Sequence, residues 1–256
     1  MQSVTHIIHC WLDVDNLLGV SKKQFMGRVK SVDWVKKRAH IFKNFTEKSL
    51  LNQTFKDFRI FLFCSPKRRN ITEEFGFDKK VETVYDFGKS RYLNEINTDY
   101  VTVTRIDSDD LFHKDVMDEI QKKAKYKGNR MSLIYRHVIQ WNLYWNFISD
   151  FFLPVSPFAS HVFPKKEYKN WEYFSKAQFS GYRTIKEELT RKRVCIIRHD
   201  DNVTWTRIGK NPRGRKYFQE ERRKRNNFIV DENDMRKILS DFGINKEKIS
   251  WKQILK

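Results

Sequence analysis

The sequence contains few of the residues that interrupt a folded chain. Only nine glycines and five prolines occur in 256 residues, and no low-complexity stretch divides them. There is no repeat of fixed period, which excludes a solenoid or propeller built from short units. We therefore expect one compact domain over residues 1–256.

Cysteine and targeting signals are also scarce. The three cysteines lie far apart and form no CxxC pair, which excludes a disulfide framework and a paired-cysteine zinc site. The first residues contain no signal-peptide pattern, and no run approaches the ~18 apolar residues of a membrane span. We therefore expect a cytoplasmic protein, with peripheral contact to an anionic membrane as a further option.

Positive charge is the strongest compositional signal. The formal net charge is +19, and residues 207–225 contribute +7 of it, with nine basic side chains against two acidic ones. Such a run suits an anionic partner: nucleic acid, an anionic membrane or a phosphorylated small molecule. Compositional bias with a solvated basic face accounts for the same charge, so both interpretations stay open. The run is also a candidate lid over ligand phosphates.

Strand and helix signals alternate in the first half of the chain. Apolar runs predict buried strands at residues 4–12 and 58–64, a shorter strand is expected at 81–85, and alternating apolar and polar residues predict a strand at 99–106. Helices are expected at about 33–51, with Asp33 as N-cap, and at 113–125. This order predicts an α/β fold with a mainly parallel, Rossmann-like sheet flanked by helices, a less regular second half and C-terminal helices.

An acidic cluster follows the strand at 99–106. Asp107, Asp109 and Asp110 place three carboxylates in four residues, and these repel one another unless a cation neutralises them. Mn²⁺ or Mg²⁺ suits the cluster, because such hard cations bind carboxylates and substrate phosphates together. Ligands of mainly parallel sheets bind beyond the carboxyl ends of the strands, where this cluster lies. An Asp-rich turn that caps the next helix is the alternative interpretation.

The residues around this cluster resemble GT-A glycosyltransferases, especially those of family 2. The segment Gly88–Asn94, the strand after it and the Asp-x-Asp-Asp motif at 107–110 are similar to a run in these enzymes. The SLLNQT segment at 49–54 resembles their helix-to-strand junction. His199–Asn202 resembles a His-x-x-Asn element of a group described as rhamnosyltransferases.

The resemblance implies a metal-dependent glycosyltransferase of the hexosyltransferase type. Such an enzyme moves a sugar from a nucleoside-diphosphate-sugar donor to a glycan or another hydroxyl acceptor. By position, the metal ligands are Asp107, Asp109 and His199, although a histidine at a strand end is also commonly structural. The candidate donor-binding residues implied by the resemblance are Arg91, Arg105, Asp107 and Asp110.

Two features depart from the family pattern. Family 2 enzymes usually carry an acidic residue after the second strand to hold the nucleobase, whereas Cys64-Ser65-Pro66 stands here, which leaves the donor nucleotide open. The usual Glu-Asp base motif is not clear either. An inverting enzyme needs a base to activate its acceptor, and the unranked candidates are Glu187, Glu188, Asp200 and Asp201.

The resemblance covers residues 4–125 well and 126–205 loosely. It divides the domain into a nucleotide-sugar-binding half (1–125), an acceptor-side half (126–205) and a basic loop with C-terminal helices (206–256). A nucleic-acid-binding protein or metal-dependent nuclease is the alternative. It is less favoured because no basic stripe with interleaved aromatics borders the carboxylates. A catalytically inactive sugar-binding protein of the same fold is a third interpretation.

Overall fold

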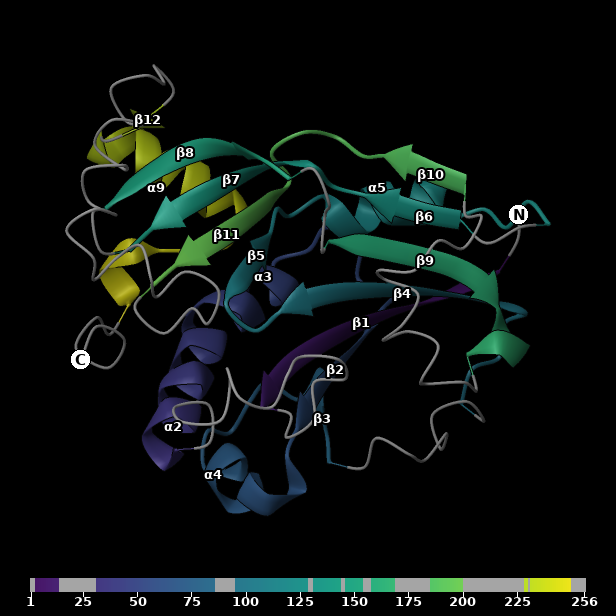
Figure 1. Ribbon diagram of the computed structural model, residues 1–256, viewed down its shortest axis with the longest axis horizontal. Helices are drawn as coiled ribbons and strands as arrows, with labels where there is room; N and C mark the ends of the chain where they lie inside the picture. Colours follow the sequence, from purple (N-terminus) through teal and green to yellow (C-terminus); the bar gives the residue numbers. More distant parts are fainter. Residues whose placement is uncertain are drawn as a thin grey trace, which may run out of the picture.

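Figure 1 shows the computed structural model of the chain. The residues that it describes are 3–13, 31–85, 95–128, 131–143, 146–153, 158–168, 185–199, 228–229 and 231–249. Several features singled out from the sequence lie outside these residues: the Gly88–Asn94 segment with Arg91, the candidate bases Asp200 and Asp201, and the basic run 207–225. Within the described segments, no helix is long and apolar enough to cross a membrane.

A seven-stranded sheet forms the centre of the molecule (Figure 1). Its strands are β1 (Val4–Asp13), β2 (Arg59–Cys64), β3 (Val81–Val84), β4 (Tyr100–Asp107), β6 (Met131–Ile134), β9 (Ala159–Pro164) and β10 (Ile185–Glu188). They are arranged in the order β10-β6-β9-β4-β1-β2-β3, and only β9 runs antiparallel to its neighbours. The mainly parallel sheet predicted from the sequence is confirmed.

A second sheet of five strands was not predicted. It contains β5 (Asp110–Phe112), β7 (His137–Asn142), β8 (Phe147–Phe152), β11 (Val194–Arg198) and β12 (Phe228–Ile229), in the order β12-β8-β7-β11-β5. β5 and β12 are only three and two residues long. Strands this short give no periodic signal, so neither was recognised in the sequence.

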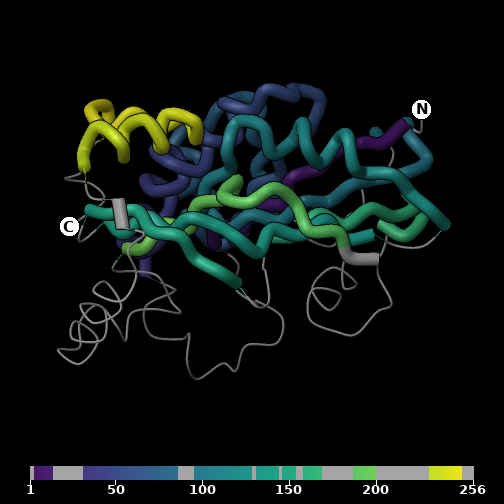
Figure 2. The backbone as a smooth tube through the Cα atoms, turned by 90° about the horizontal axis from the view of Figure 1, so that it is seen from above, coloured from purple at the N-terminus to yellow at the C-terminus, as the bar shows by residue number. Residues whose placement is uncertain are grey.

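The described helices are short. They are α2 (Val32–Ile41), α3 (Glu47–Leu51), α4 (Arg69–Glu73), α5 (Val116–Lys123) and α9 (Glu232–Asp241), with a π-helical turn at Phe42–Thr46 joining α2 to α3. Short 3₁₀ turns lie at Pro66–Arg68, Lys165–Glu167 and Lys246–Lys248. Figure 2 shows α5 and α9 on the same side of the layer of strands.

The N-terminus of α2 corrects one prediction from the sequence. Asp33 was expected to cap this helix, but Ser31 does so: its Oγ accepts a hydrogen bond from the backbone N of Trp34 at 3.1 Å. Asp33 lies in the first turn, where a carboxylate is favoured by the helix dipole. The two positions share a preference for small polar residues, so composition alone did not separate them.

One apolar core connects the two sheets. Its largest cluster combines residues of the first sheet, such as Ile8 and Leu62, with residues of the second, such as Val138 and Ile196. β1 is buried along nearly its whole length, as expected for a parallel strand covered on both faces. The site described next therefore rests on strands that are held firmly on both sides.

Candidate functional site

The strand order of the large sheet reverses between β1 and β4. From β1 the chain adds β2 and then β3 on one side, whereas β4 pairs with the other side of β1. The two strands are parallel, and their carboxyl ends meet where Trp11 lies opposite Asp107. In open α/β sheets the crevice at such a reversal is the usual ligand site. The acidic cluster predicted from the sequence begins at this point.

The acidic motif carries the chain from the first sheet into the second. Asp107 ends β4, Ser108 and Asp109 form the turn, and Asp110 begins β5. β5 pairs antiparallel with β11, with Asp110 opposite Ile196. This register brings the residue after β11, His199, beside the turn, although it is 90 positions away from Asp109 in the sequence.

Four side chains, those of Arg38, Ser108, Asp109 and His199, form what we call the strand-end cluster. Arg38 binds both carboxylate oxygens of Asp109: Nη1 donates to Oδ2, and Nη2 donates to Oδ1 at 3.1 Å. Nη2 also donates to Ser108 Oγ at 2.6 Å. His199 Nε2 lies 3.0 Å from Asp109 Oδ2. The cluster is a connected network built around one carboxylate.

The strand-end cluster is almost completely removed from water. Side-chain exposure is 10% for Arg38, 9% for Asp109 and 0% for His199. Burial by itself raises the pKa of a carboxyl group, but the Arg38 guanidinium and the His199 ring hold the pKa of Asp109 below its usual range. Asp109 is therefore an ionised carboxylate in a dry environment, where each charge interaction is strong.

Asp107 differs from Asp109 in its exposure. Its side chain is 39% exposed, and its Oδ1 accepts a hydrogen bond from Arg105 Nη2 at 3.1 Å. Because Asp107 lies two residues after Arg105 on β4, both side chains project from the same face of the strand. The structure thus pairs two of the predicted donor-binding residues. It leaves the carboxylate of Asp107 partly exposed at the end of β4.

Asp110 is buried and contacts the neighbouring strand β11. It is 5% exposed, and its Oδ1 accepts a hydrogen bond from the backbone N of Ile197 at 3.3 Å. Burial, together with the charges of Asp109 and Asp107, raises its pKa well above the usual range. Asp110 links β5 to β11 through this hydrogen bond. Asp107 is the acidic residue of the motif that lies toward solvent.

The predicted base residues lie apart from this cluster where they are described. Glu187 and Glu188 are on β10, the edge strand separated from β4 by β6 and β9. Lys123 Nζ lies 3.2 Å from Glu187, and His137 Nε2 lies 3.7 Å from Glu188. Asp200 and Asp201 follow His199 directly in the chain but lie outside the described residues.

Arg38 is the residue of the cluster that reasoning from sequence missed. It lies on α2 with buried neighbours Val35, Ala39 and Phe42, at the i, i+3, i+4 and i+7 spacing of a buried helix face. A charged residue inside such an apolar stripe needs a buried partner of opposite charge. A charged residue on the apolar face of this helix was therefore the feature of the sequence that could have identified Arg38.

Two side chains of the strand-end cluster have the spacing of metal ligands. Neighbouring ligands about 2.1 Å from an octahedral cation lie roughly 3 Å apart, the separation of His199 Nε2 and Asp109 Oδ2. Within the part of the chain that is described, no three His, Cys, Asp or Glu side chains converge on one point as a complete metal site. Magnesium-type sites commonly use one or two carboxylates and complete their shell with substrate phosphates and water. The two described side chains therefore fit a cation that takes its remaining ligands from a bound substrate or from water.

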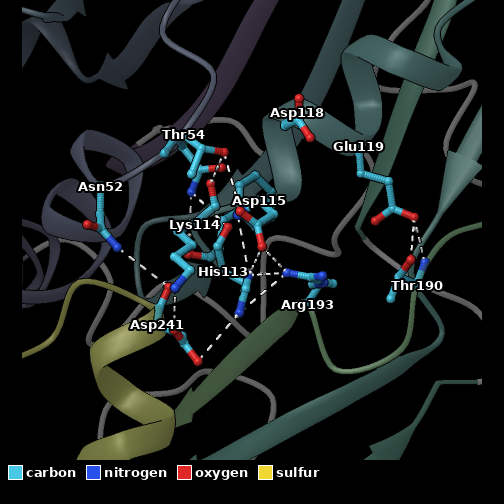
Figure 3. A network of polar contacts seen from close by, with 12 residues as sticks. Asn52, Thr54, His113, Lys114, Asp115, Asp118, Glu119, Thr190, Arg193 and Asp241 are labelled. Atoms are coloured by element: carbon cyan, nitrogen blue, oxygen red, sulfur yellow. Dashed lines mark hydrogen bonds and ion pairs between the residues drawn. The ribbon is translucent and has the colours of Figure 1, made fainter.

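A second polar cluster lies at the opposite end of the β5–β11 pair (Figure 3). We call it the joint cluster; its residues are His113, Lys114, Asp115, Arg193 and Asp241. Arg193 Nη1 donates to Asp115 Oδ2 at 2.6 Å, and Lys114 Nζ donates to Asp241 Oδ1 at 2.7 Å. The side chains of the joint cluster are 15–44% exposed. It ties α9 to the start of α5 and to β11.

Comparisons with known proteins are distant. No protein-family model matches the chain, and no curated protein matches it either. HddC from Yersinia pseudotuberculosis is similar in structure, with 13% identity over 73% of this chain and 90% of that one, at a TM-score of 0.41. The 2-C-methyl-D-erythritol 4-phosphate cytidylyltransferase IspD from Francisella tularensis is similar at 12% identity over 79% and 98%, with a TM-score of 0.37. Likenesses this distant carry no argument about activity, and neither singles out rhamnosyltransferases.

Proposed function

We propose that this protein is a glycosyltransferase that moves a sugar from a nucleoside-diphosphate-sugar to a hydroxyl group of a glycan or similar acceptor. The observation that carries the proposal is the position of the acidic motif. It stands at the reversal point of a mainly parallel sheet, with an exposed Asp107 and, two residues later, an ionised Asp109 in contact with His199. Oxygen and imidazole ligands at such a crevice suit a metal–diphosphate complex.

In the proposed site, Asp109 and His199 supply two ligands to Mn²⁺ or Mg²⁺, and Asp107 contacts the metal or the donor ribose. The bound cation stabilises negative charge on the diphosphate leaving group as a Lewis acid. Arg105 holds Asp107 in place through its hydrogen bond of 3.1 Å. Arg91 stays a predicted donor-binding residue on the basis of the sequence resemblance.

For the acceptor base, we favour Asp200 or Asp201 over Glu187 and Glu188. Chain continuity keeps both aspartates within two residues of His199, whereas each glutamate lies on an edge strand and within ion-pairing distance of a basic side chain. A general base must come within hydrogen-bond reach of the hydroxyl that it deprotonates. Contact between residues 207–225 and an anionic membrane, or closure of this run over the donor, stays a prediction from sequence.

Thermal denaturation with candidate donors tests the proposed function. UDP-, GDP-, dTDP- and CDP-linked sugars are each added with and without Mn²⁺, because a ligand that binds only the native state stabilises it by about 2.7 kcal/mol at a hundredfold excess over Kd. We expect one nucleotide class to raise the melting temperature only when Mn²⁺ is present.

The variant for this test is Asp107→Asn. Its side chain is 39% exposed, so the substitution removes a ligand without breaking the buried Arg38–Asp109 pair. Asp118→Asn is the matched control, because Asp118 is 35% exposed and pairs with Lys122 on the surface of α5. We expect the donor shift to be lost in the first variant and kept in the second. A shift with oligonucleotides and none with any sugar nucleotide contradicts the proposal.

A further inference from the structure

In the strand-end cluster, Arg38 lies where a metal ion bound to Asp109 would lie. Its guanidinium binds Asp109 through both nitrogens, and it reaches the same Oδ2 atom that lies 3.0 Å from His199 Nε2. Both ionic side chains are about nine-tenths buried. A buried carboxylate without a counter-charge is strongly unfavourable, so this ion pair is what keeps Asp109 ionised when no other cation is near.

A divalent cation and Arg38 cannot hold the Asp109 Oδ2 atom in the same way at the same time. A divalent cation held by Asp109 and His199 would bring a second positive charge close to Arg38 in a dry site, where repulsion is large. One of them must move. The arrangement therefore implies an exchange of cations on Asp109.

Resting on the proposed function, we propose that Arg38 is a stand-in cation: it neutralises Asp109 in the free protein and releases Oδ2 when the divalent metal binds. Arg38 has other partners that let it move a short distance at low cost. Its Nη2 donates to Ser108 Oγ at 2.6 Å, and its guanidinium carbon lies 5.6 Å from the centre of the Trp34 ring. The guanidinium then shifts away from Oδ2 toward Ser108 and the Trp34 ring.

The exchange has a consequence for the order of binding. Displacing Arg38 from a buried pair weakens metal binding to the free protein. A donor diphosphate adds two negative charges that both cations attract, so metal and donor each strengthen the binding of the other. The free protein is thereby kept from trapping metal without its donor.

Binding of Mn²⁺ alone tests this proposal. Free Mn²⁺ is measured by electron paramagnetic resonance during titration of the full chain, with no nucleotide present, so the result does not depend on transferase activity. Arg38→Gln removes the competing cation, and we expect Mn²⁺ to bind roughly tenfold or more tightly than in the wild type, within the range typical of coupled sites. Arg59→Gln is the control, because Arg59 is the first residue of β2, at the end of the sheet away from the strand-end cluster, where it pairs with Glu82 at 2.7 Å; the Mn²⁺ affinity of this variant should be unchanged.

A second variant covers loss of folding in Arg38→Gln. Arg38→Lys keeps one positive charge but loses the two-nitrogen contact, and its Mn²⁺ affinity should fall between those of the wild type and Arg38→Gln. If Arg38→Gln folds only when Mn²⁺ is present, the exchange is supported directly. Equal or weaker Mn²⁺ binding in the folded Arg38 variants overturns it. Absence of donor binding with tighter Mn²⁺ binding in Arg38→Gln overturns only the proposed function.

Discussion

The two ends of the β5–β11 pair carry clusters with the same residue types in different surroundings. At one end, Arg38 and His199 enclose Asp109 with side-chain exposures of 10% or less. At the other end, Arg193 and Asp115 form an ion pair with exposures of 27% and 34%. Histidine, arginine and aspartate therefore do not by themselves identify a reactive site.

The two clusters differ in their exposure to water and in their position in the fold. The joint cluster connects α9, β11 and the start of α5, where water screens each charge and the contacts act as fasteners. The strand-end cluster stands where the strand order reverses, and its charges interact in a dry environment. The same kinds of side chain thus contribute little energy at one end and interact strongly at the other.

The largest expected effect comes from removing the carboxylate at each end in turn. Asp109→Ala leaves Arg38 charged and buried, and should lower the free energy of unfolding by about 3–5 kcal/mol. Asp115→Ala removes a partner from an exposed pair, and should lower it by at most about 1 kcal/mol. Urea denaturation of both variants measures the two values. Equal losses would show that burial does not separate the clusters.

A double-mutant cycle sharpens the contrast with a smaller effect. Replacing both members, as Arg38→Met with Asp109→Leu, removes the stranded charge and should recover much of the loss, giving a coupling energy of about 2–3 kcal/mol. The Arg193–Asp115 pair should couple by less than about 1 kcal/mol. Raising the salt concentration should reduce only the second coupling, because the first pair is shielded from ions. Salt dependence in the Arg38 cycle would contradict the buried pair.

Sequence patterns predicted the elements around the site but not the contacts across it. The strand at 4–12 was found as a short apolar run and the strand at 99–106 from its alternation, and the second of these placed the acidic motif at a strand end. The joining of the two sheets was not predictable, since β5 has three residues. Its pairing with β11 depends on the fold of the whole chain.

The same limit explains what was predicted of the individual site residues. His199 was suggested by resemblance alone, and only the β5–β11 register brings it to Asp109. Asp110 was grouped with Asp107 because they are neighbours in the motif. Strand alternation and the crossing between sheets nevertheless give them different exposures. Asp110 is 5% exposed as a residue, and the side chain of Asp107 is 39% exposed. Local sequence carries the motif, and tertiary structure assigns the role of each member.

The smallest expected effect is a difference in pH dependence between the two ends. Burial, aided by the nearby Arg193 and Lys114 charges and opposed by Asp115 and Asp241, lowers the pKa of His113 in the folded protein. The unfolded chain then binds the proton more readily, so the stability that His113 contributes is present above pH ~6.5 and is lost as the pH falls below it. The pKa of Asp109 is also lowered, but its contribution is lost only below pH ~4, the range of an ordinary aspartate. In His113→Asn, the loss of stability between pH 7 and pH 5 should be smaller than in the wild type by less than about 1 kcal/mol, the usual scale of partly exposed charge contacts. Urea denaturation at both pH values measures this difference, and a wild-type slope in the variant would place the acid-sensitive group elsewhere.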